Sequence, residues 1–219
     1  MRYNYVAFDL DGTLTDPFQG ITNSLIYAFQ KMDKEVPERA ELSKMIGPPL
    51  SESFPMYYGF TDAETDTAIK HFQTYFKDQG LYENVLFPGV KEMLEALTAR
   101  GIKVLLATSK PEVFGREILC HFGIDGYFTY AGGGSMDESF VKKGAILNYV
   151  IEKSGAEKRC DVVMVGDRCH DLIGARENGV DGIGVLFGYG SREELEKENP
   201  VYIAENMEML KNYLLGCDA

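Results

Sequence analysis

Residues 5–14 read YVAFDLDGTL, and this stretch decides the fold. Its four successive apolar residues at 5–8, followed by a polar segment with two aspartates and a glycine, are typical of a buried strand that ends in a turn. Strands of this kind occur in parallel sheets whose two faces are covered by helices. The stretch therefore predicts the first strand of an α/β fold, with Asp9 and Asp11 at its carboxyl end.

Further apolar runs alternate with helical patterns along the rest of the chain. Strands are expected at 102–107, 127–131, 162–165, 183–186 and 201–203, and helices at about 111–122, 140–153, 171–178 and 205–215. The glycines at 132–134 and at 182 and 184 match no nucleotide-binding fingerprint and are expected to form turns. The alternation predicts a Rossmann-like parallel sheet with helices on both faces.

Residues 17–82 interrupt this alternation, because their apolar residues follow helical spacing. One helical stripe is formed by Ile21, Leu25, Ala28, Phe29 and Met32. The segment 61–64, TDAE, has the spacing of a capping box before a second helix. We therefore predict an α-helical cap domain at 17–82, inserted into an α/β core formed by 1–16 and 83–219.

Composition restricts the partners of the chain. Its 219 residues carry 34 acidic and 22 basic side chains, a net charge of −12, whereas a nucleic-acid groove needs clustered lysine and arginine. The start of the chain lacks the apolar region of a signal peptide, and no apolar run is long enough to span a membrane. We expect a cytoplasmic monomer or homodimer that binds neither nucleic acid nor membrane.

Polar side chains follow three of the predicted strands where those strands end. They are Asp9, Asp11, Thr108, Ser109, Asp167 and Asp171. In an open parallel sheet ligands bind at the carboxyl ends of the strands, so we expect these side chains to lie together. Several carboxylates in one place repel one another unless a cation lies among them, and hard oxygen ligands favour Mg²⁺. Asp171 taken alone is equally well interpreted as a helix N-cap.

Ser109 and Lys143 are the candidates for binding an anion. Ser109-x-x-Glu112 has capping-box spacing, and the backbone N–H groups of a helix start also bind phosphate. Lys143 falls near the centre of the buried stripe of the helix at 140–153, and Lys142 lies roughly 110° away on the helical wheel. A buried lysine indicates an anionic partner, although its stem could instead extend to solvent.

These groups together suggest phosphoryl transfer. In this hypothesis one carboxylate attacks a phosphorus atom while Mg²⁺ bridges it to the phosphoryl oxygens. Thr108, Ser109 and Lys143 neutralise the remaining charge. Asp11 reaches the leaving oxygen as general acid and then activates the water that hydrolyses the acyl phosphate.

The motifs that carry this chemistry resemble those of the haloacid dehalogenase superfamily of hydrolases. The DxDGT motif lies at 9–13, the second motif at 108–110 as Thr108-Ser109-Lys110, the lysine of the third at 143 and GDxxxD at 166–171. The resemblance implies that Asp9 is the nucleophile and Asp11 the acid/base. It implies phosphate-binding roles for Gly12, Thr13, Thr108, Ser109 and Lys143. It also implies Mg²⁺ held by Asp9, Asp167 and the backbone carbonyl of Asp11, with Asp171 supporting the metal shell.

The segment 46–50, IGPPL, resembles a cap loop of the phosphoglycolate phosphatase-like branch. Gly144 follows Lys143 where that branch usually has proline, a variant found among nucleotidases and unassigned phosphatases. The resemblance implies a Mg²⁺-dependent phosphatase, phosphoglycolate phosphatase-like, that hydrolyses a small phosphorylated metabolite through an aspartyl phosphate. The alternatives are a nucleoside 5'-monophosphate phosphatase and a phosphosugar mutase of the same fold. A signalling receiver domain also gathers acidic residues and a lysine, but it lacks a helical insertion.

Overall fold

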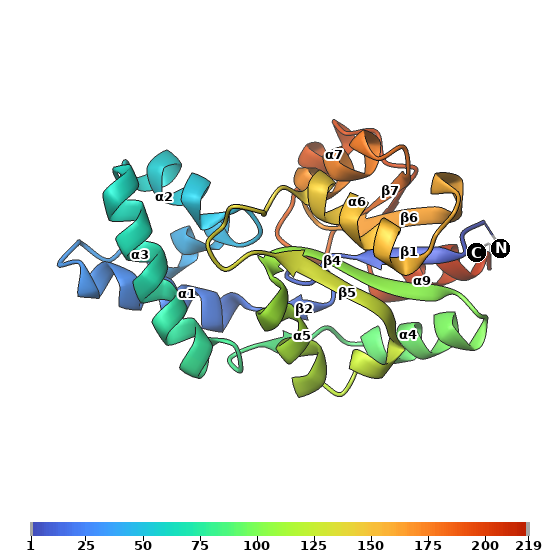
Figure 1. Cartoon of the computed structure of the whole chain (residues 1–219), viewed down its shortest axis with the longest axis horizontal. Coiled ribbons are helices and arrows are strands. Elements are labelled where there is room, and N and C mark those ends of the chain that lie inside the picture. The colour runs from blue at the N-terminus through green and yellow to red at the C-terminus, as the bar shows by residue number, and fades with distance from the viewer. Residues whose placement is uncertain (1, 218–219) are drawn as a thin grey trace.

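The computed structural model describes residues 2–217, which form a parallel six-stranded sheet and a separate group of helices (Figure 1). The strand order is β5-β4-β1-β6-β7-β8. The strands are β1 (Tyr5–Phe8), β4 (Lys103–Pro111), β5 (Phe128–Gly134), β6 (Val162–Gly166), β7 (Asp181–Val185) and β8 (Tyr202–Ala204). The predicted α/β fold with a Rossmann-like parallel sheet is confirmed.

Helices cover both faces of the sheet (Figure 1). One face carries α6 (Lys143–Ser154) and α7 (Cys169–Glu177), and the other carries α4 (Val90–Ala99), α5 (Glu112–His121) and α9 (Met207–Leu215). The side chains of β1 alternate between the two cores: Val6 and Phe8 belong to one cluster, and Tyr5 and Ala7 to the other. This alternation explains why β1 is apolar throughout, since both of its faces are buried.

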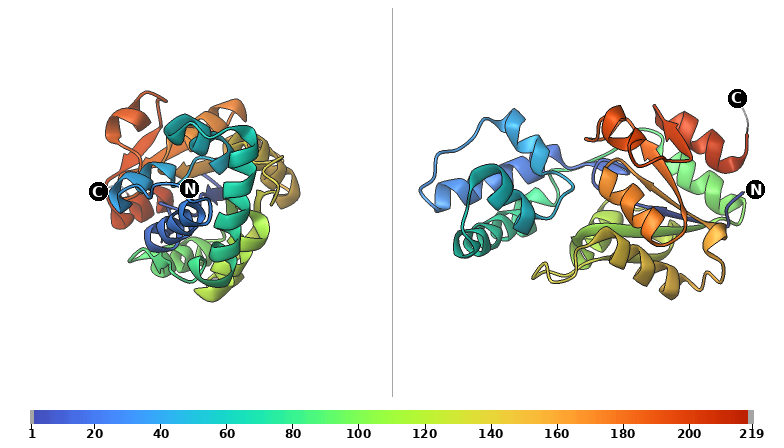
Figure 2. Two further views of the ribbon diagram at one scale, coloured as in Figure 1. Left: turned by 90° about the vertical axis from the view of Figure 1, so that its left-hand side faces the viewer. Right: turned by 90° about the horizontal axis from the view of Figure 1, so that it is seen from above.

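A helical lobe lies beyond the carboxyl end of the sheet, far from both chain ends (Figure 2). It contains α1 (Phe18–Lys31), a 3-10 turn (Arg39–Met45), α2 (Leu50–Tyr58) and α3 (Asp62–Tyr75), followed by a π turn (Phe76–Gly80). A short antiparallel pair, β2 (Thr15–Asp16) and β3 (Val85–Leu86), lies where the chain enters and leaves the lobe. We define the helical lobe as these helices of the segment 17–82.

The helical lobe has apolar contacts of its own. Phe29 and Phe54 are buried, and the Phe54 and Phe60 rings stack with centroids 5.2 Å apart. The predicted capping box before α3 is confirmed, because Thr61 Oγ1 accepts from the Glu64 backbone N–H and Glu64 Oε2 accepts from the Thr61 N–H. No helix between residues 2 and 217 has both the length and the apolar character that crossing a bilayer requires.

The expectation that the glycine segments form turns is wrong. Gly132, Gly133 and Gly134 are the last residues of β5, and Gly182 and Gly184 lie within β7. They are glycines because neighbouring groups come very close. A Cβ at Gly132 would lie 2.5 Å from a methyl of Val150, and one at Gly133 would lie 2.6 Å from the Lys110 carbonyl oxygen. Small residues here let α6 and the adjacent strand pack against the backbone.

Candidate active site

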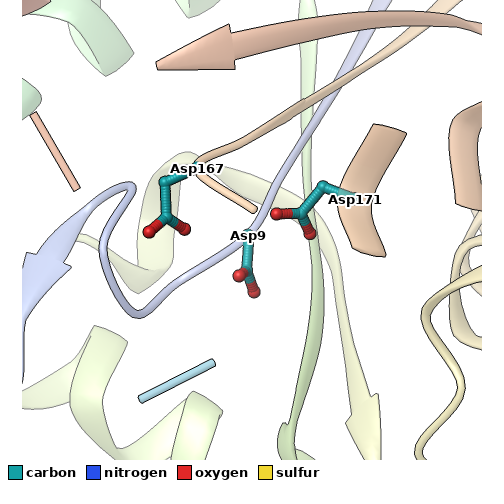
Figure 3. A group of neighbouring side chains, drawn as sticks. All are labelled: Asp9, Asp167 and Asp171. Atoms are coloured by element: carbon teal, nitrogen blue, oxygen red, sulfur yellow. The ribbon is translucent and has the colours of Figure 1, made fainter. Parts of the chain in front are cut away.

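Three buried aspartates meet at the carboxyl ends of two neighbouring strands (Figure 3). Asp9 follows β1, Asp167 follows β6, and Asp171 lies in the first turn of α7. Each offers a carboxylate oxygen within 4.8 Å of the others. The residues lie together because β1 and β6 are adjacent parallel strands, so the loops that follow them leave the same edge of the sheet. Asp171 is not an N-cap, because it lies inside α7, where it accepts the Arg168 N–H at 3.1 Å.

Lys143 lies against this cluster as the first residue of α6. Its Nζ is 2.8 Å from Asp9 Oδ1 and 3.0 Å from Asp171 Oδ1, and it donates to the Ala107 carbonyl at 3.1 Å. These three partners account for all three protons of the ammonium group. Lys142 is exposed, so the helical spacing distinguished the buried lysine from its neighbour. The predicted helix start at 140 is three residues early, because α6 begins at Lys143 itself.

Burial dominates the electrostatics of the cluster. It raises the pKa of Asp167 well above its ordinary value, and the nearby carboxylates of Asp171 and Asp9 add to the rise. Burial also raises the pKa of Asp171 to about 6, against the opposing effect of Lys143. Burial lowers the pKa of Lys143, but the Asp171 and Asp9 carboxylates outweigh this, and the pKa is raised overall.

The donor set fits a hard divalent cation. Two of the three buried carboxylates, Asp9 and Asp171, share the Lys143 ammonium group, and among the described residues Asp167 has no salt-bridge partner. The ionised cluster therefore carries an excess of negative charge in a dry environment. Carboxylate oxygens are the ligands that Mg²⁺ and similar ions prefer. A metal at this position would offset the repulsion from neighbouring carboxylates, which adds to the effect of burial in raising the pKa values of Asp167 and Asp171.

Asp11 points away from the cluster and toward the helical lobe. Its Oδ2 is 2.8 Å from Lys110 Nζ, and that ammonium lies 4.3 Å from the centre of the Phe76 ring. Among residues 2–217, Asp11 Oδ1 is buried without a hydrogen-bond partner. Burial raises the pKa of Asp11, and the charge of Lys110 partly offsets the rise. A raised pKa favours the protonated form of this carboxyl group, which is the direction that a general acid requires.

Lys110 is a functional candidate that was part of the second motif but to which the sequence assigned no role. It immediately follows Thr108 and Ser109 at the end of a strand, which was the available signal. The Lys110 side chain lies at an irregularity in β4, where the pairing with β5 shifts register between Thr108 and Pro111. Such a shift cannot be inferred from apolar periodicity.

Gly12 and Thr13 pack against Asp167. Gly12 has φ +82°, and a Cβ there would lie 2.2 Å from Asp167 Oδ2. Thr13 Oγ1 donates to Asp167 Oδ1 at 3.4 Å. The Gly12 N–H donates to the Thr15 carbonyl and the Thr13 N–H to the Leu10 carbonyl. Both residues therefore hold the turn and Asp167 in place, and their direct contact with phosphate stays a prediction.

The predicted helix cap at Ser109 is wrong. β4 continues to Pro111 because Pro111 still pairs with Gly134 of β5, so α5 begins only at Glu112. The Ser109 hydroxyl donates instead to the Val141 carbonyl at 3.0 Å. Thr108 is buried, and its hydroxyl accepts the Lys110 N–H at 3.2 Å. Both hydroxyls remain at the carboxyl end of β4, beside β1.

Two cavities open from this edge toward the helical lobe. The first, of about 630 Å³ including open solvent, reaches Asp11 and Lys110. Its walls are mostly apolar and include Ile21, Met45, Leu50, Phe72, Phe76 and Phe114. The second, of about 560 Å³ including open solvent, reaches Lys143 and is lined by polar and charged groups that include Glu52, Lys142 and His170. Gly47, Pro49, Ser109 and Val141 line both cavities.

Comparison with known proteins identifies the family. Residues 6–185 match the model of the haloacid dehalogenase-like hydrolases. The chain therefore belongs to this family, as its four motifs predicted.

Similar proteins extend over almost the whole chain. It is 42% identical to a 5'-nucleotidase from Pseudomonas aeruginosa, covering 98% of this chain and 96% of that protein. A phosphoglycolate phosphatase from Vibrio parahaemolyticus is 29% identical, covering 94% of this chain and 93% of its own. The crystal structure of a predicted phosphatase from Clostridium acetobutylicum superposes with a TM-score of 0.94 at 40% identity, covering 99% of this chain and 100% of that one. These similarities indicate a phosphatase.

Proposed function

We propose that this protein is a Mg²⁺-dependent phosphatase that hydrolyses a small phosphomonoester through an aspartyl-phosphate intermediate. One observation carries the proposal: a buried carboxylate, Asp9, is held by Lys143 beside two further aspartates. A second carboxyl group, Asp11, lies two residues away and faces a separate cavity. A nucleophile and an acid on opposite sides of one backbone turn match the needs of phosphoryl transfer.

In the first step Asp9 is the nucleophile. Lys143 holds Oδ1, which leaves Oδ2 to attack the phosphorus atom. The bond from phosphorus to the leaving oxygen breaks, and Asp11 donates its proton to that oxygen. Thr108, Ser109 and Lys143 stabilise the charge on the phosphoryl oxygens. Mg²⁺ held by Asp9, Asp167 and the Asp11 carbonyl, with Asp171 supporting them, would supply charge neutralisation at the same oxygens.

In the second step Asp11 acts as a base. It is now ionised, so it can remove a proton from the water that attacks phosphorus. The bond between phosphorus and Asp9 Oδ2 breaks, and inorganic phosphate and the carboxylate of Asp9 are restored. Asp11 has regained its proton at the end of this step, so the enzyme returns to its starting state.

Within this chemistry the apolar cavity supports a nucleoside 5'-monophosphate better than phosphoglycolate. The leaving group must lie next to Asp11, where the walls include the rings of Phe72, Phe76 and Phe114. Lys110 is the one cationic side chain among the described residues that line this cavity, and it is already paired with Asp11. The carboxylate of a glycolate leaving group would therefore lack a free cation, whereas a nucleoside has a flat base that packs against aromatic rings.

Phosphate release from a substrate panel tests the proposal. The panel contains nucleoside 5'-monophosphates, phosphoglycolate, sugar phosphates and acetyl phosphate, each with and without Mg²⁺, and Asp9→Asn protein serves as the blank. We expect Mg²⁺-dependent release with the highest kcat/KM for a nucleoside monophosphate. Release from none of these compounds by the folded protein would refute a phosphatase. Phosphoryl transfer between sugar positions that requires a bisphosphate would instead identify the mutase.

A further inference from the structure

A short loop of the helical lobe lies between the two cavities. It comprises residues 46–50, IGPPL, which we call the cap loop. Gly47 and Pro49 line both cavities, and Pro48 and Leu50 line the apolar one. The position of the cap loop therefore sets the shape of the space on either side of the reacting groups.

A core arginine holds the start of this loop. Arg168 Nη1 donates to the Ile46 carbonyl at 2.9 Å, a contact between residues 122 positions apart in the sequence. Gly47 lies directly against the same side chain: it has φ +104°, and a Cβ there would lie 3.3 Å from Arg168 Cγ. The close approach and the backbone conformation both favour glycine at this position.

The Arg168 side chain is itself held in place by Glu194. Its Nε donates to Glu194 Oε1 at 2.9 Å, and the same oxygen accepts the Cys169 N–H at 2.9 Å. The Arg168 side chain is only 15% exposed. A planar guanidinium with one edge bound to a carboxylate presents its other N–H groups in a fixed direction, which a flexible lysine would not do.

Away from the segments where the chain enters and leaves the lobe (16–20 and 80–86), two other hydrogen bonds that involve a side chain join the core to the helical lobe among the described residues, and both involve exposed groups. Glu138 accepts the Ser51 N–H at 2.8 Å, and Gln73 Nε2 donates to the Met136 carbonyl at 2.8 Å. Contacts at exposed positions compete with water and fix geometry less strongly. Arg168 therefore provides the least exposed of these three links between the core and the helical lobe.

We propose that Arg168, held by Glu194, is a positioning residue that keeps the cap loop closed over the substrate and thereby sets the selectivity for large leaving groups. This inference rests on the proposed phosphatase function. Arg168 does not touch Asp11 or the apolar cavity, and it acts through Ile46 and Gly47. Substrates whose leaving group fills the cavity depend on the loop, whereas acetyl phosphate has a leaving group too small to reach most of its walls.

The test compares Arg168→Met with Arg168→Lys and with Arg176→Met. Arg168 directly precedes α7, and Arg176 lies in the last turn of that helix, where it pairs with Glu198 at the surface. Its replacement therefore controls for the loss of a guanidinium group. For Arg168→Met we expect KM for a nucleoside 5'-monophosphate to rise roughly tenfold or more, the equivalent of one lost charge-assisted hydrogen bond. The kcat/KM for acetyl phosphate should change much less. Arg168→Lys should recover only part of the loss.

Hydrogen exchange gives a readout that needs no substrate. Amides in a peptide spanning residues 42–54 should exchange faster in Arg168→Met than in wild type or Arg176→Met protein. Unchanged exchange would overturn the inference. Equal losses of kcat/KM on acetyl phosphate and on the nucleotide would also overturn it, because they would indicate damage to Asp167. If wild-type protein hydrolyses no compound in the panel, the proposed function fails, and the exchange result still decides whether Arg168 holds the loop.

Discussion

Replacing Lys143 by methionine tests the electrostatics of the site most sharply, and Lys142→Met is the matched control. Methionine has a similar length and leaves the apolar contacts of the stem. It removes the only cation among residues 2–217 that lies within 3.0 Å of both Asp9 and Asp171. Lys142 precedes it in the sequence and is exposed. Both variants replace one lysine by methionine, so they differ only in the burial and the ionic partners of the lysine that is removed.

The expected magnitude follows from the burial of the ion pairs. Removing one partner from a buried ion pair costs about 3–5 kcal/mol, because the remaining charge stays in a dry environment. In a chain of this size that corresponds to a fall in Tm of about 6–20 °C. The full loss of unfolding free energy is expected in chelator above pH 7. Asp171 has a pKa of about 6 in the folded wild-type protein, so it is ionised there. The loss should shrink toward pH 5, because protonation of the carboxylates removes the unpaired charge.

Thermal unfolding of wild type, Lys143→Met and Lys142→Met in chelator at several pH values measures this effect. Lys142→Met should unfold within about 0.5 kcal/mol of wild type, as exposed substitutions usually do. Phosphate release by Lys143→Met should also fall far below that of Lys142→Met. Equal stability of the two variants at pH 8 would contradict the claim that Lys143 neutralises the buried carboxylates. A loss of unfolding free energy that does not depend on pH would contradict it too.

Three further predictions follow from the same contacts. Lys110→Met removes the charge that lowers the Asp11 pKa, so that pKa should rise further and the basic limb of the kcat/KM profile should move to higher pH. An unmoved limb would argue against Asp11 as the acid. In chelator, wild type should lose stability relative to Asp171→Asn as pH rises from 4 through about 6, because the raised pKa of Asp171 makes the folded state bind this proton more tightly than the unfolded state does. Mg²⁺ should restore the wild-type Tm above pH 7. Gly47→Ala should raise KM for nucleotides more than for acetyl phosphate, as the strained backbone and the contact with Arg168 displace the cap loop; parallel changes for both substrates would contradict this.

The parts of the fold that depend on periodicity could be predicted from the sequence. Four apolar residues before Asp9 identify a strand buried on both faces, and adjacent parallel strands then bring Asp9 and Asp167 together. Helical spacing alone separated Lys143 from Lys142. The spacing of Thr61 and Glu64 likewise predicted a capping box, because capping depends on residues close in the chain.

The parts that depend on close approach could not be predicted in this way. The glycines of β5 have the composition of a turn, and only the neighbouring Val150 side chain explains why a strand needs them. Ser109 has the spacing of a cap, but pairing between Pro111 and Gly134 keeps its segment in the sheet. The contact between Arg168 and the Ile46 carbonyl depends on how the helical lobe lies against the core, which no local pattern encodes.

The central claim is that Asp9 is phosphorylated during turnover. The direct measurement is to quench the Mg²⁺-supplied enzyme in acid within milliseconds of mixing it with its best substrate, and to locate the added phosphoryl group by mass spectrometry. We expect the modification on Asp9 in wild type, more of it in Asp11→Asn, and none in Asp9→Asn. Turnover without any phosphorylated aspartate at any quench time, or phosphorylation at another residue, would contradict it.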